Sequence, residues 1–118
     1  MGAIDPQNHE AERFTGALAA ALGDRLVQVA LFGSRARAQA RPDSDYDLMV
    51  VVREADAETR RAVHTLALSF ELDRYVSLST KILAREQFES LRATGTRFWR
   101  SFMRDARTLW PSQSRNAS

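Results

Sequence analysis

The chain has 118 residues, of which 44% are hydrophobic and 27% are charged, and it carries a formal net charge of +2. This length predicts one domain with a modest core and leaves no room for a separate substrate-binding domain. The absence of cysteine excludes disulfides and thiolate metal sites, so any chemistry must use carboxylates, hydroxyls and guanidinium groups.

No apolar run reaches the roughly 20 residues that a membrane-spanning helix needs, and the first residues lack the apolar core of a signal peptide. We therefore expect a cytoplasmic protein that does not bind membranes. Lys81 is the sole lysine, so arginine supplies almost all of the positive charge. Arginine suits phosphate-rich ligands, but a preference for arginine codons explains the excess equally well.

The first part of the chain predicts a helix and a buried strand. Apolar residues recur at helical spacing from Glu10 to Leu22, and Gly23 is suited to end that helix. The next run, from Leu26 to Phe32, is apolar and rich in strand formers, and Gly33 ends it.

A short helix, a turn and a second strand are expected next. Residues 34–38 predict the start of a short helix, and residues 41–44 predict the turn that ends it. The stretch from Asp47 to Val52 has the β-branched content of a strand in the middle of a sheet.

The second half of the chain predicts a helix, a strand and two further helices. Residues 55–72 carry one apolar helical stripe, with acidic residues in the first turn. Residues 75–83 alternate between apolar and polar side chains, as a strand with one buried face does. Residues 85–91 and 96–109 have helical patterns, and Pro111 begins a polar tail.

This order of elements indicates an α/β (α+β) fold, in which a small mixed β-sheet has helices packed on one face. We expect a single domain over residues 10–110, with a flexible N-terminus at residues 1–9 and a disordered tail at residues 111–118. No internal repeat or domain boundary interrupts the pattern.

Two short motifs beside the predicted strands carry the chemistry. Gly33 lets the backbone approach a triphosphate, and the amides of the following helix start, with the Ser34 hydroxyl, attract phosphate oxygens. Asp45 and Asp47 are two residues apart, so on a strand their carboxylates project from one face and can share a hard cation such as Mg²⁺. The alternative is a helix cap followed by a solvated turn.

These residues resemble the signature of the minimal nucleotidyltransferase domains of the DNA polymerase β superfamily, over about residues 26–83. The resemblance implies the nucleotidyltransferase fold, with Gly33 and Ser34 holding the NTP phosphates. It implies that Asp45 and Asp47 bind the metal. It also implies transfer of NMP to a hydroxyl acceptor with release of pyrophosphate, and ATP is the expected NTP.

Three residues after the phosphate loop bear on this resemblance. Arg35 and Arg37 are candidates for nucleotide binding, and Arg35 is the better one because it directly follows Ser34. The alternative is that both are ordinary solvated helix residues. Ala38 stands where the family pattern has a second glycine, and this difference could tighten or reshape the loop.

The third carboxylate of the superfamily, which completes the metal site and helps to deprotonate the acceptor, has no evident counterpart. The predicted strand at residues 75–83 shows Ser77 and Ser79 where an acid is expected. Asp73, and less readily Glu71, could serve if the strand starts early. We take Asp73 as the candidate third catalytic acid, and the alternative is a solvated loop residue.

Three functions remain open. The first is Mg²⁺-dependent nucleotidyl transfer, for which a HEPN-domain protein is the leading acceptor, because the proteins that this chain resembles often act as antitoxins beside HEPN toxins. The second is a binding module that neutralises its partner by occupancy, with weak or no transfer activity. Nucleotide addition to a nucleic acid is the weakest, because the nearly balanced charge argues against a large phosphate footprint.

Overall fold

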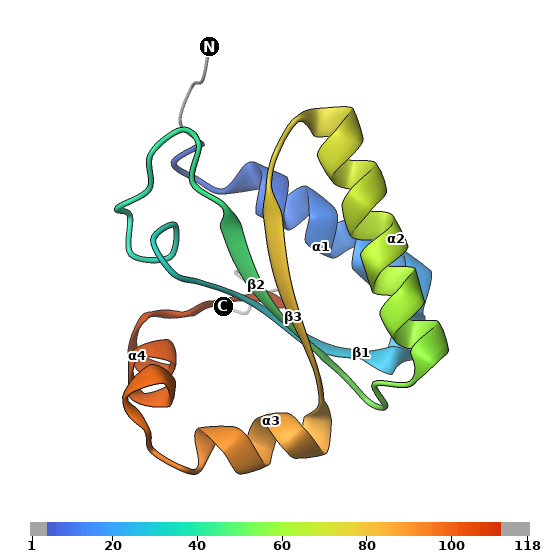
Figure 1. The fold of residues 1–118 in the computed structure, drawn as a ribbon, viewed down its shortest axis with the longest axis vertical. Helices are drawn as coiled ribbons and strands as arrows, with labels where there is room; N and C mark the ends of the chain where they lie inside the picture. The colour runs from blue at the N-terminus through green and yellow to red at the C-terminus, as the bar shows by residue number, and fades with distance from the viewer. Residues whose placement is uncertain (1–4, 112–118) are drawn as a thin grey trace, which may run out of the picture.

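A four-stranded mixed sheet forms the centre of the protein (Figure 1). The computed structural model describes residues 5–111. The strands lie in the order β3-β2-β1-β4, where β1 is antiparallel to β2 and β4, and β2 is parallel to β3. Their bounds are β1 Leu26–Phe32, β2 Tyr46–Val52, β3 Leu78–Ala84 and β4 Arg107–Trp110. The mixed sheet predicted from the sequence is confirmed.

Two long helices, α1 (His9–Leu22) and α2 (Ala57–Arg74), lie together on one side of the sheet (Figure 1). A short 3₁₀ helix, η1 (Gly23–Arg25), leads from α1 into β1. α2 begins after Asp56, whose carboxylate accepts a hydrogen bond from the backbone N–H of Thr59 at 2.9 Å and so caps the helix. The buried side chains on this side of the sheet include Phe14, Leu18, Leu31, Leu48, Val50, Val52 and Val63.

Two shorter helices, α3 (Arg85–Arg92) and α4 (Arg97–Asp105), lie on the other side of the sheet (Figure 1). Side chains of β2 alternate between the two sides, so Met49 and Val51 face α3 and α4. The expectation that the helices share one face therefore holds for α1 and α2 only. The reason is that β2 is apolar on both faces, and its second face needs cover. The cluster there contains Ala30, Met49, Val51, Phe88, Trp99 and Phe102.

The C-terminal segment differs from the prediction, which continued the last helix to Leu109. α4 ends at Asp105. β4 then pairs with the edge of β1 that β2 leaves free, and Thr108 lies opposite Ala30. The apolar spacing of this segment is compatible with a helix, but pairing with β1 satisfies its backbone and overrides the local helical preference.

Of the ends that the sequence predicts to be flexible or disordered, residues 1–9 and 111–118, the parts at residues 1–4 and 112–118 lie outside the described residues. Among those described, Asp5 and Asn8 contact the domain. Oδ2 of Asp5 accepts hydrogen bonds from the Tyr46 hydroxyl and from the backbone N–H of Glu10, each at 3.0 Å. Asn8 is buried.

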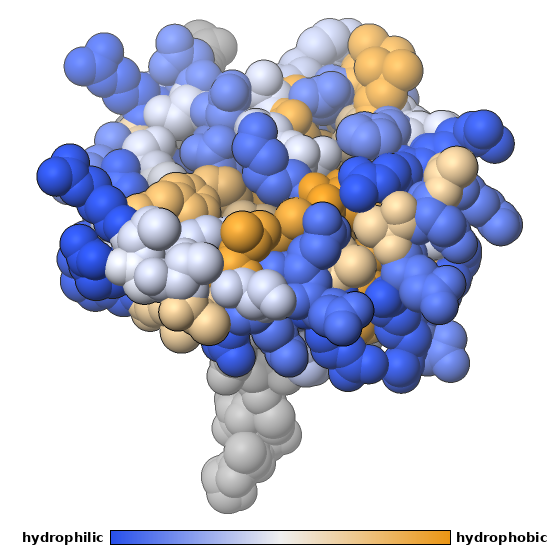
Figure 2. Space-filling model, turned by 60° about the horizontal axis from the view of Figure 1, so that its bottom comes forward, coloured by the Kyte–Doolittle hydropathy of each residue, from blue (hydrophilic) through white to orange (hydrophobic). Residues whose placement is uncertain are grey.

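The side of the molecule with α3 and α4 has a partly apolar surface. Figure 2 turns this side toward the viewer and shows apolar side chains gathered in the middle of a mainly hydrophilic surface. The large apolar side chains of α3 and α4 that stay exposed are Leu91, Phe98 and Met103. Within residues 5–111, no helix combines the length and the apolar character needed to cross a membrane.

Replacing Trp99 with alanine tests the packing of α4 on the sheet. Trp99 is 8% exposed, and its ring lies 5.7 Å from that of Phe88 and 5.2 Å from that of Phe102. We expect Trp99→Ala to lower the free energy of unfolding by about 3 to 5 kcal/mol, because it leaves a cavity. Met103→Ala, on the exposed side of α4, should change it by about 0.5 kcal/mol or less. Urea unfolding measures both, and equal losses would contradict this packing.

Candidate functional site

The loop after β1 makes one helical turn. The backbone N–H groups of Ala36 and Arg37 both donate to the carbonyl of Gly33, at 3.1 and 3.2 Å. Ala38 then adopts a left-handed conformation with φ 58°, which ends the turn as a glycine commonly ends a helix. The short helix predicted at residues 34–38 is therefore a single turn, closed at the position where the family pattern has its second glycine.

Gly33 is required at its position for two reasons. Its φ of 78° lies in the region that favours glycine. In addition, a β-carbon at this position would clash with Oδ2 of Asp47 and lie 3.1 Å from its Cγ. The register of β1 and β2 places Phe32 opposite Asp47 and so brings this carboxylate over the glycine. The structure therefore brings together the glycine loop and the second aspartate.

The start of β2 is electronegative because Asp45 and Asp47 are close together. Burial raises the pKa of Asp47 above its ordinary value, and the Asp45 charge raises it further. The charge of Lys81, a hydrogen bond with Ser79 and the charge of Arg37 oppose this increase without reversing it. A cation bound between the two carboxylates would relieve their repulsion.

The donor set of this site fits Mg²⁺. This ion prefers oxygen ligands and is commonly held by one or two carboxylates together with substrate phosphates and water. Asp45 and Asp47 supply two carboxylates beside the loop that begins at Gly33. Within residues 5–111, no group of three His, Cys, Asp or Glu side chains is placed to hold a metal ion. The remaining ligands would therefore be phosphate and water oxygens.

The third catalytic acid predicted from the sequence does not join this pair. β3 begins at Leu78, later than predicted, and its register places Ser79 opposite Asp47. Asp73 is exposed in the last turn of α2, so it belongs to the helix and not to an early strand. Glu71 has a structural contact, since its carboxylate accepts a hydrogen bond from the backbone N–H of Leu78 at 2.8 Å. The longer helix therefore removes both acids from the strand register that would have aligned them with Asp47.

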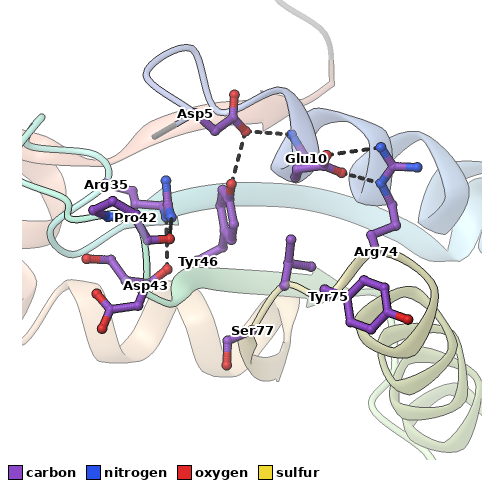
Figure 3. A pocket seen from close by; sticks show the side chains of 11 residues that line it. Asp5, Glu10, Arg35, Pro42, Asp43, Tyr46, Arg74, Tyr75 and Ser77 are labelled. Carbon is purple, nitrogen blue, oxygen red and sulfur yellow. Dashed lines mark hydrogen bonds and ion pairs between the residues drawn. The ribbon is translucent and has the colours of Figure 1, made fainter. Parts of the chain in front are cut away.

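Arg35, predicted as the better nucleotide ligand of the two arginines, packs within the loop between β1 and β2, and its nucleotide role stays a prediction. Its guanidinium lies over the ring of Tyr46, 3.9 Å from the ring centroid (Figure 3). Its Nε donates to the carbonyl of Ser44 at 3.1 Å, and its Nη2 donates to the carbonyl of Pro42 at 3.4 Å. With 5% of its surface exposed, Arg35 holds the loop between β1 and β2 and thereby positions the start of β2.

A pocket of about 540 Å³ opens beside this arginine (Figure 3). Its charged and polar side chains are mostly paired with one another, Arg74 with Glu10 and Asp5 with the Tyr46 hydroxyl. Nη1 of Arg35 is buried and has no hydrogen-bond partner within the described part of the chain. Neither Asp45 nor Asp47 lines this pocket. The carboxylates that do line it, those of Asp5, Glu10 and Asp43, would repel a triphosphate. It is therefore separate from the candidate nucleotide site.

The positive charge of Arg37 acts on the aspartate pair, since it lowers the pKa of Asp47. With Gly33 it also lines a second pocket, of about 210 Å³, whose other wall is formed mainly by α4. Sequence reasoning missed this contribution from α4. The signal was the spacing of three and four residues, which places four side chains on one face of the helix. They are Phe98, Ser101, Phe102 and Asp105.

Comparison with known proteins identifies the family. The family described as polymerase beta, nucleotidyltransferase matches residues 20–109, which include the glycine loop, both aspartates and β3. The chain belongs to the polymerase β nucleotidyltransferase family. A comparison with curated protein sequences gives no match.

Solved structures that resemble this chain include toxin–antitoxin proteins. A toxin–antitoxin crystallised with AMP-PNP has a TM-score of 0.56 and 20% identity, over 86% of this chain and 74% of that chain. The MntA-HepT toxin–antitoxin has a TM-score of 0.51 and 19% identity, over 90% and 74%. A candidate nucleotidyltransferase of Sulfolobus solfataricus has a TM-score of 0.52 and 20% identity, over 86% and 78%. At these identities the likeness shows a shared fold, and the predicted nucleotidyltransferase fold is confirmed.

Replacing Ala38 with glycine tests the loop that follows β1. A left-handed conformation is unfavourable for alanine by about 1 to 2 kcal/mol and unstrained for glycine. We expect Ala38→Gly to raise the free energy of unfolding by about 1 kcal/mol, once the greater freedom of glycine in the unfolded chain is subtracted. Ala93 is exposed like Ala38 but has a φ of −72°, so Ala93→Gly should destabilise the protein. Thermal unfolding of both variants would reject the argument if Ala38→Gly were the more damaging change.

Proposed function

We propose that this chain is a Mg²⁺-dependent nucleotidyltransferase that transfers NMP from an NTP, with ATP as the expected donor, to a hydroxyl group. The observation that carries the proposal is the contact of Asp47 with Gly33, which puts a carboxylate pair beside a loop suited to phosphate. Membership of the family supports the type of reaction. The structural relative crystallised with AMP-PNP supports the choice of an adenine nucleotide.

In the proposed reaction, Gly33 and Ser34 bind triphosphate oxygens through backbone amides and the serine hydroxyl. Asp45 and Asp47 would hold Mg²⁺, which would supply Lewis-acid stabilisation of the charge at the α-phosphate. The acceptor oxygen forms a bond to the α-phosphorus, and the bond from that phosphorus to pyrophosphate breaks. The hydroxyl proton passes to water, since no three-acid group occurs within residues 5–111. Arg37 adds positive charge on the phosphate side of the loop.

The proposed acceptor is a partner protein, and a HEPN-domain toxin is the leading candidate. The support comes from structural relatives that are toxin–antitoxin proteins. Modification of the toxin by NMP would then be the way in which this chain neutralises it.

Calorimetric titration with a nonhydrolysable ATP analogue and Mg²⁺ tests the nucleotide site. The unaltered protein should bind the analogue only when the metal is present. We expect Asp45→Asn and Asp47→Asn each to weaken this binding at least about tenfold, because each removes one charged oxygen ligand of the cation. Asp43→Asn is the matched control, since Asp43 is exposed on the same loop and lines the other pocket. It should leave binding unchanged.

Two results of this titration would count against the proposal. Absence of metal-dependent binding by the unaltered protein would remove the nucleotide site altogether. Equal losses in Asp43→Asn and Asp45→Asn would show that the loop responds to any change of charge. Mass spectrometry of the HEPN partner after incubation with ATP and Mg²⁺ would then test transfer itself, as a mass increase of one AMP that Asp45→Asn abolishes.

A second function is favoured by Ser79 lying opposite Asp47, at the position where a third acid was expected. In this alternative, the chain keeps the fold and neutralises its partner by binding alone. It predicts that Asp45→Ala leaves both partner binding and neutralisation intact in a toxicity assay. Loss of neutralisation with intact binding would decide for the transfer reaction.

A further inference from the structure

A groove next to the glycine loop has the composition of a site for an aromatic ligand. It encloses about 210 Å³ between Gly33 and Arg37 on one side and α4 on the other. Phe32, at the end of β1, lines it together with Phe102, and the centroids of the two rings lie 5.7 Å apart. Gly33 is also the residue that contacts the Asp47 carboxylate, so the groove begins where the proposed phosphate site ends.

Phe98 offers the accessible aromatic surface of this groove. It is 47% exposed, whereas Phe102 is 5% exposed and packed in the core. The rings of Phe98 and Phe32 meet edge to face at 5.8 Å, and the rings of Phe98 and Trp99 meet at 4.9 Å. Neighbouring rings therefore hold Phe98 in place. A large apolar ring left half exposed beside a phosphate loop is suited to stack with a nucleobase, and such stacking contributes about 1 to 3 kcal/mol per base.

The groove also has polar lining residues on α4. They are Ser101 and Asp105, three and seven residues after Phe98. The Asp105 carboxylate accepts hydrogen bonds from Arg104 at 3.0 and 3.1 Å. Each carboxylate oxygen has a further lone pair, so it can also accept from a ligand. An ionised carboxylate accepts hydrogen bonds and donates none, which favours a base with an exocyclic amino group over one that presents only carbonyl oxygens there.

We propose that this groove binds the base of the NTP, with Phe98 stacking on the ring and Asp105 accepting a hydrogen bond from an exocyclic amino group. The site takes a purine that carries an amino group, because the aromatic side chains that line the groove, Phe32, Phe98 and Phe102, offer a two-ring base more apolar surface than a one-ring base can cover. Adenine meets these requirements, and uracil does not. This inference rests on the proposed function, because it places the base relative to phosphates bound at Gly33.

Three titrations in the presence of Mg²⁺ test the groove: nonhydrolysable ATP analogue, nonhydrolysable UTP analogue and tripolyphosphate. We expect Phe98→Ala to weaken binding of the ATP analogue about tenfold and to leave tripolyphosphate binding unchanged, because only the base contacts Phe98. Phe98→Tyr keeps the ring and should bind the ATP analogue normally. Met103→Ala, on the exposed side of the same helix, is the control for a general effect on α4.

Asp105 is tested by base preference. The unaltered protein should bind the ATP analogue more tightly than the UTP analogue. Asp105→Asn should reduce this preference severalfold, because the amide presents a donor where the carboxylate only accepts, and tripolyphosphate binding should stay the same. A preference that is unchanged in Asp105→Asn would overturn its role.

The outcomes separate this inference from the proposed function. If Phe98→Ala binds the ATP analogue as tightly as Met103→Ala does, the base lies elsewhere and the nucleotide site stands. If Phe98→Ala loses tripolyphosphate binding as well, the change has disturbed the phosphate loop, and the assignment of Phe98 to the base is overturned. If the unaltered protein binds neither the ATP analogue nor tripolyphosphate, the inference and the proposed function fail together.

Discussion

The contact between the Asp47 carboxylate and the backbone of Gly33 determines most of the geometry at the site. It exists because β1 and β2 are antiparallel neighbours, with the end of one strand paired to the start of the other. A glycine at the end of β1 leaves space for the carboxylate, and Arg35 fixes the loop between the strands from the opposite side. The core that packs these strands therefore also sets the distance between phosphate loop and acids.

The two sides of the sheet contribute differently to this arrangement. The side of α1 and α2 holds the stabilising contacts of the loop, where Arg35 stacks on Tyr46 and the Tyr46 hydroxyl donates to Asp5. The other side carries the aspartates and the wall that α4 adds next to Gly33. Arg35 is buried and stabilises the loop, whereas Arg37 is exposed and has the proposed electrostatic role.

Local sequence was sufficient for the features that depend on neighbouring residues. Apolar runs and a glycine identified β1, β2 and the loop, and the spacing of two acids identified the pair at the start of β2. Features that depend on register or distant packing could not be predicted in this way. Asp73 remained in α2 because the helix runs further than its apolar stripe. The direction of Arg35 depends on its contacts with Pro42, Ser44 and Tyr46 further along the chain. β4 forms because β1 has an edge that β2 leaves unpaired.

The two outer strands of the sheet restrict how this protein can assemble. β3 and β4 are the edges of the sheet, and an exposed edge invites another chain to extend it. β3 carries the exposed charge of Lys81 near its middle, and β4 runs only from Arg107 to Trp110 before Pro111, which has no N–H to donate. Both edges are thus poor templates for a further strand. Complexes with a second copy or a partner are therefore expected to form through helices and loops.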